Sequence, residues 1–346
     1  MVEVAVVGAA GYAGIEAVRL VLAHPQLSLA LATSAADAGK PIGSVYPALS
    51  GVTDLSFSEP DADAIGATSQ VALLAVPHTA ALALVPELLA RGVTVVDMSA
   101  DYRLKDAATY EAWYGATHSS AELLGEAVFG LPELDRSRLF GARLVACPGC
   151  YPTATTLAAL PALESGRGAG NRVIVDAKSG VSGAGRSATA GTHYTTVNES
   201  VQPYKVGSHR HTPEIEQALS VAAGRDMSVI FTPHLIPMSR GLLSTVYIDV
   251  AGGLTTAEAV ETYRDRYRDE PFVHVHDAGT MPSTAEVRGT NRAAIGVVVD
   301  GRTNTLVAAC AIDNLGKGAA GQAVQCLNAV LGYPETEGLD RPGPVV

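Results

Sequence analysis

The chain has 346 residues, of which 47% are hydrophobic and 17% are charged. This balance is typical of a folded globular protein rather than a disordered one, and the length favours two domains over one. The formal net charge of -11 argues against nucleic acid or an anionic membrane as the main partner. Any phosphate that this protein binds must therefore be held locally, by a loop or by a few cations.

The first residues, MVEVAVVGAAGYAG, are apolar but lack a basic segment and contain Glu3, so we do not expect a signal peptide. Prolines interrupt the longest uncharged stretches, 65–86 and 144–163, and neither is expected to span a membrane. The chain contains the cysteines Cys147, Cys150, Cys310 and Cys326. Without an export signal, we expect them to be reduced thiols in the cytoplasm.

The first half of the chain predicts a parallel sheet with helices on both faces. An apolar run at 2–7 ends in the glycine-rich GAAGYAG and continues into a segment of helical periodicity that Pro25 stops. Further buried strands are predicted at 27–33, 71–76, 93–99 and 142–147, with a helix at 79–92. Buried strands that alternate with helices indicate a doubly wound, Rossmann-type α/β domain.

The second half predicts an α+β domain with a mixed or antiparallel sheet. Strands are predicted at 172–178, 227–235, 242–250, 294–300 and 305–312, and helices at 152–165, 256–270 and 318–333. No periodicity is evident from Ser179 to His211, and an irregular stretch of that length is usually a functional loop. The tail after the last helix is expected to be loose.

Gly8, Gly11 and Gly14 lie where the first strand turns into the first helix. Glycine there lets the backbone turn tightly, approach a pyrophosphate and direct helix N–H groups at it. The spacing differs from the commoner Gly-x-Gly-x-x-Gly, and a glycine turn that binds nothing is the alternative. The position directly after a first strand favours a dinucleotide site.

The end of the second strand predicts which dinucleotide binds. An NAD site usually places Asp or Glu there to accept from the ribose 2′-hydroxyl. Here Thr33 and Ser34 occupy that position, and an uncharged hydroxyl pair tolerates a 2′-phosphate. We therefore predict NADP, with Lys40 as a candidate phosphate partner, while the nearby Asp37 leaves NAD as the alternative.

The segment CPGCYPT, 147–153, has three interpretations: a redox dithiol, half of a metal site, or one nucleophile with a second cysteine nearby. Cys147 closes an apolar strand, whereas Cys150 adjoins a predicted helix N-terminus, whose dipole stabilises a thiolate. A dithiol would place its first cysteine at the helix, and a metal site would need further ligands. We predict Cys150 as the nucleophile, Cys147 as a buried inert thiol, and no metal.

A thiolate nucleophile needs an acid or base, and the segment GSHRHTPEIEQ, 207–217, offers one. His211 lies three residues before Glu214, and Pro213 fits the first turn of a helix, so the carboxylate could orient the imidazole. The alternative is that His209 and His211 are solvated loop residues. A dinucleotide domain together with a poised cysteine favours a catalytic histidine.

These parts together limit the chemistry. A thiol next to a nicotinamide forms a thioacyl enzyme whose carbonyl carbon exchanges hydride, as in phosphorylating aldehyde dehydrogenases. The substrate is then an acyl phosphate or its aldehyde. Candidates for holding its carboxylate and phosphate are Arg103, Arg186, Lys205 and Arg240, and each could equally be a surface cation.

Seven motifs occur in one order along the chain: GAAGYAG, LAVPHTAA (74–81), VDMSADYRL (96–104), VACPGCYPT (145–153), KSGVSGAGR (178–186), SHRHTPEIEQ (208–217) and NLGKGAAGQAVQ (314–325). Together they closely resemble the N-acetyl-gamma-glutamyl-phosphate reductase family of arginine biosynthesis, over nearly the whole chain.

The resemblance implies an NADP-binding domain from 1–148 and 313–346, completed by the C-terminal helix, and a catalytic and oligomerisation domain from 149–312. It implies Cys150 as the nucleophile and His211 as the acid/base, with Glu214 beside it. The expected substrate-binding residues are Arg103, Ser182, Arg186, His209 and Arg240. The expected cofactor-binding residues are Gly8, Ala10, Gly11, Tyr12, Gly14, Ser34, Pro77, Gly183 and Asn314. Many relatives carry an arginine directly after the serine that ends the second strand, where this chain has Ala35.

The implied reaction is the NADPH-dependent reduction of N-acetyl-gamma-glutamyl phosphate to N-acetylglutamate 5-semialdehyde and phosphate, through a cysteine thioester. Alternatives with the same chemistry are aspartate-semialdehyde dehydrogenase and a lysine-pathway reductase of carrier-bound aminoadipyl phosphate. A cysteine hydrolase and a non-catalytic NADP-sensing protein are alternatives from other classes. The expected partners are the small-molecule substrate and further copies of the chain, in a dimer or tetramer, with no nucleic acid and no membrane.

Overall fold

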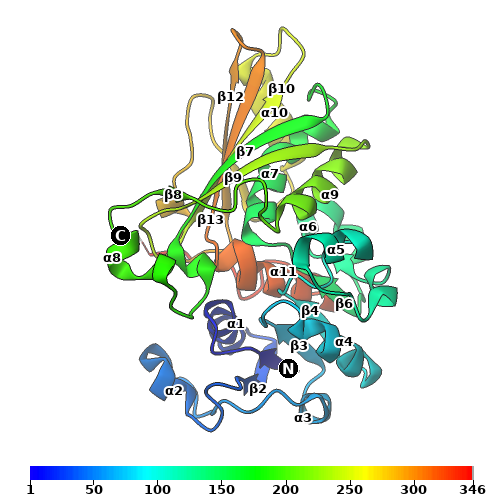
Figure 1. Cartoon of the computed structure of the whole chain (residues 1–346), viewed down its shortest axis with the longest axis vertical. Helices are drawn as coiled ribbons and strands as arrows, with labels where there is room; N and C mark the ends of the chain where they lie inside the picture. The colour runs from blue at the N-terminus through cyan, green and yellow to red at the C-terminus, as the bar shows by residue number, and fades with distance from the viewer. Residues whose placement is uncertain (345–346) are drawn as a thin grey trace. The chain divides into compact units, whose positions relative to one another are not determined.

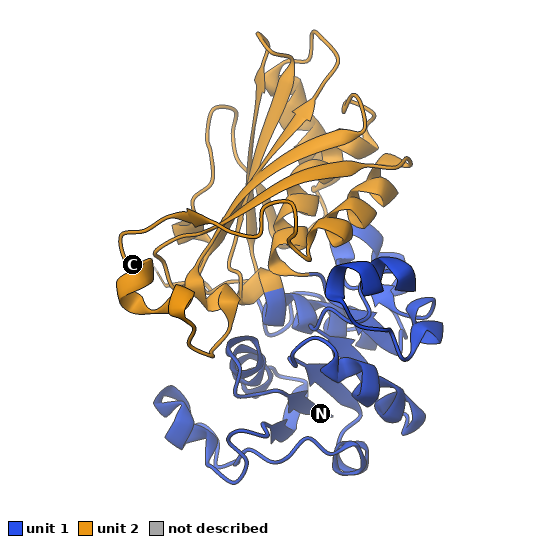
Figure 2. Cartoon of the chain, viewed as in Figure 1, with its two compact units in different colours: residues 1–148, 319–341 blue, residues 149–318, 342–346 orange. Residues whose placement is uncertain are grey.

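A computed structural model describes residues 1–344 and divides the chain into two compact units, each with its own sheet (Figure 2). Unit 1 consists of 1–148 and 319–341, and unit 2 consists of 149–318 with the tail from Pro342. Within the described residues, no helix is both long enough and apolar enough to cross a membrane.

Unit 1 contains a six-stranded sheet in which every strand is parallel to its neighbours (Figure 1). Its strands are β1 (Val2–Val7), β2 (Leu27–Thr33), β3 (Val71–Leu74), β4 (Thr94–Asp97), β5 (Val128–Phe129) and β6 (Leu144–Ala146), in the order β2-β1-β3-β4-β6-β5. The predicted doubly wound α/β class is confirmed. The sheet order reverses between β1 and β3, and ligands of such sheets bind at the carboxyl ends of the strands at this point.

Helices cover both faces of this sheet. The helices of unit 1 are α1 (Tyr12–Leu22), α2 (Ile42–Val45), α3 (Ala62–Thr68), α4 (Ala80–Ala90), α5 (Ala107–Tyr114), α6 (Pro132–Asp135) and α11 (Gly321–Leu331). Of these, α1, α3, α4 and α11 contact the strands. Ala5 and Val7 pack with buried residues of α3 and α4, while α1 contacts α11. Alternate residues of β1 are thus buried on opposite faces, which explains its unbroken apolar sequence.

Unit 2 contains a mixed seven-stranded sheet, in the order β11-β12-β13-β10-β7-β9-β8. Its strands are β7 (Arg172–Ser179), β8 (Gln202–Pro203), β9 (Ser228–Leu235), β10 (Leu242–Asp249), β11 (Val273–Val275), β12 (Ala293–Asp300) and β13 (Thr305–Ile312). The predicted mixed sheet is confirmed, with parallel pairing of β7 with β9 and antiparallel pairing of β10 with both β7 and β13.

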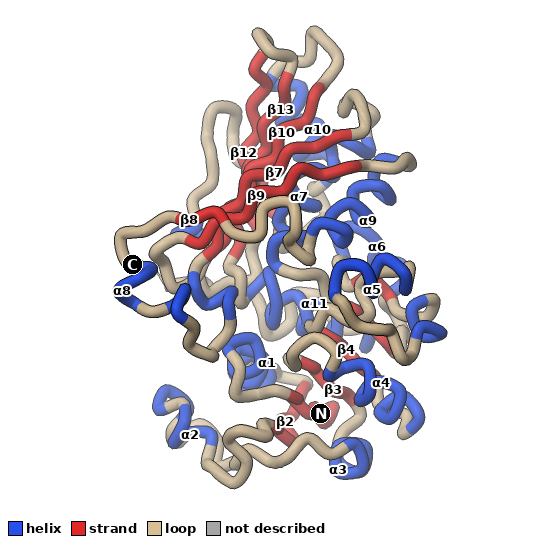
Figure 3. Tube along the Cα trace, viewed as in Figure 1, coloured by secondary structure: helices blue, strands red, loops and turns tan. Residues whose placement is uncertain are grey.

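The helices of unit 2 gather on one face of its sheet (Figure 3). They are α7 (Cys150–Glu164), α9 (Thr212–Ala223) and α10 (Thr256–Arg266), which pack on β10 and β13, on β9, and on β12, respectively. The other face exposes Ile174, Ile230 and Tyr247. A pocket of about 390 Å³ on that face is lined by Arg172, Ile174, Tyr247, Asp249 and Thr305.

Two predicted helix boundaries differ clearly from the structure. The helix predicted at 256–270 ends at Arg266, and the one predicted from 318 starts at Gly321, because Gly316–Ala320 form a π-helical turn. The irregular stretch 179–211 contains only short elements, such as α8 (Tyr194–Val197) and β8.

The tail is not loose as far as Arg341. Leu339 is 5% exposed, and the Asn328 side-chain amide on α11 donates to the carbonyls of Glu335 and Glu337. A side chain inside the last helix therefore holds the segment that follows it. The local sequence pattern does not predict these hydrogen bonds from Asn328.

Candidate active site

The glycine turn after β1 contains two glycines that the fold itself requires. Gly8 has φ +78°, and a Cβ there would lie 2.5 Å from the Ala75 carbonyl oxygen. A Cβ on Gly14 would lie 2.2 Å from the Gly8 oxygen. Both positions need glycine whether or not a ligand binds.

Gly11 in the same turn has a different environment. The nearest atom to a Cβ there is the Gly8 oxygen at 3.4 Å, an ordinary contact. Packing within the chain therefore leaves this glycine unexplained, and close approach of a pyrophosphate to the backbone would explain it. The turn fits a dinucleotide.

The other expected cofactor residues of unit 1 surround this turn. The Ala10 carbonyl accepts from the Tyr46 hydroxyl at 2.7 Å, and Tyr12 is 37% exposed at the start of α1. Ser34 is half-buried, but Thr33 is fully buried. Only one member of the predicted hydroxyl pair is therefore accessible to a cofactor.

Pro77 lies in the loop between β3 and α4, which a buried carboxylate holds. Asp101 is fully buried and accepts from the backbone N–H groups of Thr79 and Ala81, at 2.9 and 3.2 Å, and from the Tyr110 hydroxyl at 2.8 Å. Sequence reasoning missed this role. The sequence feature that could have indicated it is the acidic residue within VDMSADYRL, 96–104.

Cys150 is the first residue of α7, with Gly149 as its N-cap. The thiol is thus at the positive end of a 15-residue helix dipole, as predicted. The carboxylate of Glu214, which is 1% exposed, accepts from the Gly149 N–H at 2.8 Å. Glu214 therefore ties the turn before the cysteine to α9, a contact that indicates a positioning role.

Gly318 packs directly against the cysteine. A Cβ on Gly318 would lie 2.7 Å from the Cys150 Cβ. This glycine belongs to the π-helical turn Gly316–Ala320, within the motif NLGKGAAGQAVQ. π-Helical turns often occur at functional sites. Here the turn permits a backbone to approach the predicted nucleophile.

His211 is the N-cap residue of α9 and lies in an aromatic cluster. Its ring centroid is 6.0 Å from the Tyr151 ring and 4.8 Å from the His209 ring. Tyr151 follows Cys150 directly, so the structure brings His211 close to the cysteine turn. The interpretation of both histidines as solvated loop residues is wrong, because each is half-buried among aromatic rings.

The neutral imidazole of His209 accepts a hydrogen bond from the backbone of His211. Burial, then the charges of Lys205 and Arg210, lower the pKa of His209 to about 4. Its Nδ1 accepts from the His211 backbone N–H at 3.1 Å. This contact requires an unprotonated Nδ1 and indicates that His209 positions His211. A contact between His209 and substrate stays a prediction.

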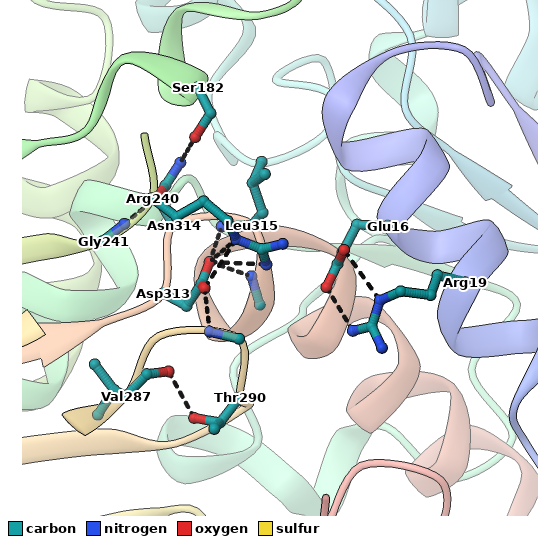
Figure 4. A network of polar contacts seen from close by, with 12 residues as sticks. Glu16, Arg19, Ser182, Arg240, Gly241, Val287, Thr290, Asp313, Asn314 and Leu315 are labelled. Atoms are coloured by element: carbon teal, nitrogen blue, oxygen red, sulfur yellow. Dashed lines mark hydrogen bonds and ion pairs between the residues drawn. The ribbon is translucent and has the colours of Figure 1, made fainter. Parts of the chain in front are cut away.

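A buried acid organises the loops that carry Arg240 and Asn314 (Figure 4). Asp313 is fully buried and accepts from Arg240 Nε and Nη2 at 3.0 and 3.1 Å, and from backbone N–H groups at Leu315 and Gly316. It also accepts from the Gly289 N–H at 2.5 Å. The sequence analysis did not identify Asp313. The feature that could have indicated it is an acidic residue directly after the strand β13.

Asn314 joins two expected site residues. Its Oδ1 accepts from the Gly241 N–H at 2.8 Å, and its Nδ2 donates to Ser182 Oγ at 2.9 Å (Figure 4). A Cβ on Gly183 would lie 3.8 Å from the same Nδ2. The structure therefore brings Ser182, Gly183, Arg240 and Asn314 together in unit 2.

Known proteins resemble this chain over nearly its whole length. Residues 3–142 match the family described as "Semialdehyde dehydrogenase, NAD binding domain", and residues 150–314 match "Semialdehyde dehydrogenase, dimerisation domain". The chain is 48% identical to the N-acetyl-gamma-glutamyl-phosphate reductase of Symbiobacterium thermophilum over 99% of both chains. It is 50% identical to the same-named protein of Syntrophobacter fumaroxidans over 99% of both chains. The chain belongs to the N-acetyl-gamma-glutamyl-phosphate reductase family.

Solved structures show the same fold at lower identity. Aspartate semialdehyde dehydrogenase II of Vibrio cholerae, complexed with ASA, is 16% identical, with a TM-score of 0.71 over 95% of this chain and 98% of that one. The Candida albicans enzyme with NADP is 14% identical, with a TM-score of 0.70 over 95% and 98%. This member of the reductase family is thus an oxidoreductase with an NAD(P)-binding domain and a dimerisation domain.

The remaining expected cations of this reductase-family chain differ in exposure. Arg103 is 6% exposed in unit 1, and its Nη2 donates to the Met98 carbonyl at 2.7 Å, so the surface-cation interpretation is wrong for it. Arg186 and Lys205 of unit 2 are exposed, and Arg240 is half-buried.

The four cysteines of this family member form no disulfide within the described residues. Cys147 is fully buried, and its contact with Cys326, followed by burial, raises its pKa well above the ordinary value. It is therefore a protonated thiol at neutral pH, unlike a catalytic thiolate. Residues 1–344 contain no cluster of three or more His, Cys, Asp or Glu that could hold a metal ion.

Proposed function

We propose that this chain reduces N-acetyl-gamma-glutamyl phosphate to N-acetylglutamate 5-semialdehyde and phosphate, with NADPH, as a step in arginine biosynthesis. The observation that carries the proposal is Cys150 at the N-terminus of α7, with His211 in the ring cluster of the adjacent Tyr151. The relatives that bear the name of this activity match the chain over 99% of its length. In this proposal 1–148 with 313–346 hold the cofactor, and 149–312 carry the acyl group.

The proposed reaction begins with the Cys150 thiolate. Its sulfur attacks the γ-acyl carbon, the phosphate leaves with the electrons of its C–O bond, and a thioester remains on Sγ. Backbone N–H groups in the first turn of α7 stabilise the tetrahedral oxyanion. Bound NADPH supplies the hydride that reduces the thioester. His211 donates a proton to the developing oxygen and takes one back when the C–S bond breaks to release the aldehyde.

Arg240 is the proposed anchor for an anionic group of the substrate. Its guanidinium is half-buried and oriented by the fully buried Asp313, so it loses little freedom when it binds an anion. Ser182, held by Asn314, would contribute a hydroxyl nearby. Arg103 and the exposed Arg186 are further candidates for phosphate contacts.

We propose NADP rather than NAD as the cofactor. Support comes from the end of β2, where the half-buried Ser34 and the exposed Ala35 leave no acid in the usual NAD position. Gly11 leaves room for the pyrophosphate, and Gly8, Ala10, Tyr12 and Gly14 form the rest of the turn. Pro77 in unit 1, and Gly183 and Asn314 in unit 2, are the other proposed cofactor contacts.

We propose that the chain forms a homodimer, or a tetramer built from two such dimers, through the uncovered face of the seven-stranded sheet. Ile174, Ile230 and Tyr247 on this face are 41%, 48% and 36% exposed. Apolar side chains gathered on one face favour a protein interface. A reducing cytoplasm is the proposed compartment, because the mechanism needs Cys150 as a thiol.

A substrate comparison tests the proposal. NADP reduction is followed with N-acetylglutamate 5-semialdehyde and phosphate, and in parallel with aspartate semialdehyde, the substrate suggested by the names of the fold neighbours. We expect turnover that requires phosphate and prefers the acetylated aldehyde. Preference for aspartate semialdehyde, or a requirement for a carrier protein, would assign the chain to one of the related reactions instead. Thioester hydrolysis unaffected by NADP would favour a cysteine hydrolase, and tight NADP binding without turnover or a reactive thiol would favour a non-catalytic NADP-sensing protein.

A further inference from the structure

We infer that Asp37 and Lys40 form a charge pair that sets the cofactor preference, in which Lys40 binds the 2′-phosphate of NADP and Asp37 positions its ammonium group. This inference rests on the proposed use of NADP. Ala35, directly after Ser34, supplies no cation for this phosphate.

The pair lies beside the glycine turn. The segment 34–40 follows β2 directly, and β2 pairs in parallel with β1, whose end forms the turn. The Ala9 N–H donates to the Thr33 carbonyl at 2.8 Å, and the Tyr46 hydroxyl reaches the Ala10 carbonyl from the segment beyond Lys40. In a Rossmann-type domain, the ribose 2′ position lies at this end of the second strand.

The backbone of the segment is held in place. The Asp37 N–H donates to the Ser34 carbonyl at 3.3 Å, and the Lys40 N–H donates to the Asp37 carbonyl at 3.1 Å. Lys40 is also fixed from outside the turn, because its carbonyl accepts from the Phe57 N–H at 2.9 Å. The base of the lysine side chain therefore has a defined position.

The two side chains differ in burial. Asp37 is 5% exposed, whereas the Lys40 side chain is 57% exposed, and Nζ lies 2.8 Å from Asp37 Oδ1. An ammonium group has three N–H donors, so a bond to Asp37 leaves donors for phosphate oxygens. A carboxylate at this place without its lysine would repel a 2′-phosphate and accept from a 2′-hydroxyl, as in NAD sites.

No other local cation can take this role. Lys40 is the only lysine or arginine between Arg19 and Arg91. Arg19 pairs with Glu16 on α1 at 2.7 Å (Figure 4), and Arg91 pairs with Asp63 at 2.6 Å. The 2′-phosphate of a cofactor seated on the glycine turn would therefore meet Lys40 as the one cation supplied by this stretch of chain.

The test measures NADP and NAD affinity by calorimetry, and kcat/KM for both reduced cofactors, in the wild type, K40A, K40R and D37N/K40A. In K40A we expect NADP affinity to fall at least about tenfold, with NAD affinity unchanged or raised, because only NADP loses a charged partner. K40R is the matched control and should keep the preference for NADP. D37N/K40A should recover part of the lost NADP affinity, because the repelling carboxylate is gone.

Two results would overturn the inference: a wild type that prefers NAD, or a K40A variant whose affinities for NADP and NAD fall by the same factor. Failure of the proposed function is distinguishable, since it would appear as absent turnover in a wild type that still binds NADP. The calorimetric comparison needs no turnover and therefore decides the role of Lys40 in either case.

Discussion

At the scale of single residues, the two cysteines of CPGCYPT have opposite environments. Cys147 is fully buried beside Cys326, which raises its pKa, whereas Cys150 begins a helix and is half-buried. A helix N-terminus stabilises a thiolate, and burial in an apolar surrounding suppresses one. Reactivity in this segment therefore follows from position and not from residue type.

We predict that Cys150→Ser lowers kcat by roughly 10⁴-fold, because the thioester cannot form at a useful rate. Cys147→Ala should keep turnover and lose only stability, because a small cavity replaces the sulfur. Steady-state rates and alkylation of the native protein, read by mass spectrometry, provide the measurement. Near-normal rates in Cys150→Ser, or alkylation of Cys147 first, would contradict the assignment.

Substitutions at Gly11 and Gly14 distinguish a glycine that ligand binding would require from one that the fold requires. Gly11→Ala should leave the melting temperature nearly unchanged, since its Cβ would meet only one atom, at 3.4 Å. It should weaken NADP binding by about tenfold, because the new methyl group stands where the pyrophosphate approaches the backbone. Gly14→Ala is the matched control and should lose stability instead, because its Cβ would lie 2.2 Å from a carbonyl oxygen. Thermal unfolding and NADP titration of both variants test this division, and equal binding losses at equal stability would contradict it.

Asp97 makes the stability of unit 1 depend on pH. It is fully buried at the end of β4, and burial raises its pKa from 3.8 to about 6, against the opposing hydrogen bonds from Ser99. The unfolded chain loses this proton first, so the folded state is penalised as pH rises between about pH 4 and pH 6. The penalty is about 3 kcal/mol once both states are ionised.

Asp97→Asn removes this titration. The free energy of unfolding of the wild type minus that of the variant should therefore fall by about 3 kcal/mol as pH rises from about 4 to about 7. Denaturant titrations at several pH values measure the difference. A difference that stays constant, or that rises with pH, would show that folding does not raise the pKa of Asp97.

The sequence predicted the local position of Cys150, at the start of a helix, better than it predicted the long-range contacts around it. Cys150 could be placed because a proline and a periodic run reveal the helix behind it. Asp313, in contrast, contacts Arg240 across 73 positions, and Glu214 contacts Gly149 across 65. No local pattern reports such contacts, because they depend on which strands and helices pack together. The buried state of Arg103 was unpredictable for the same reason.

At the scale of elements, the long strands and helices followed their hydrophobic periodicity, and the exceptions were short or irregular. β5 has two residues, too few to produce a pattern, and Gly316–Ala320 form a π-helical turn where a regular helix start was predicted. This turn brings Gly318 against the first residue of α7. The irregular element is therefore the one that packs against the predicted nucleophile.

Gly318→Ala should displace Cys150, because the new Cβ would lie 2.7 Å from the cysteine Cβ and α7 is buried along its length. We expect kcat to fall at least about tenfold with a smaller change in KM, since the geometry of attack changes more than substrate binding. Gly125→Ala is the matched control, because φ there is −69° and a Cβ would meet no atom within 4 Å. Steady-state kinetics with an alkylation rate for Cys150 measure both effects. Unchanged kcat in the folded variant would mean that α7 moves aside without cost.

At the scale of the whole molecule, the two sheets differ in how many of their faces helices cover. The parallel sheet of unit 1 has helices on both faces, whereas the mixed sheet of unit 2 has α7, α9 and α10 on one face only. A seven-stranded sheet with one bare face exposes apolar side chains that a second copy of the chain would bury. The dimerisation-domain family match over residues 150–314 covers this sheet.

Charge placed on the bare face should therefore dissociate the assembly. We predict that Ile174→Glu combined with Ile230→Glu yields monomers, because two carboxylates per chain would lose their hydration in the interface. Val221→Glu is the matched control: Val221 is 67% exposed on α9, on the helical side, and its replacement should leave the assembly intact. Light scattering coupled to size exclusion measures the mass of each variant, and thermal unfolding checks that each is folded. If the double variant kept the mass of the wild type, the interface would lie on another surface, and the exposed isoleucines would need a different explanation.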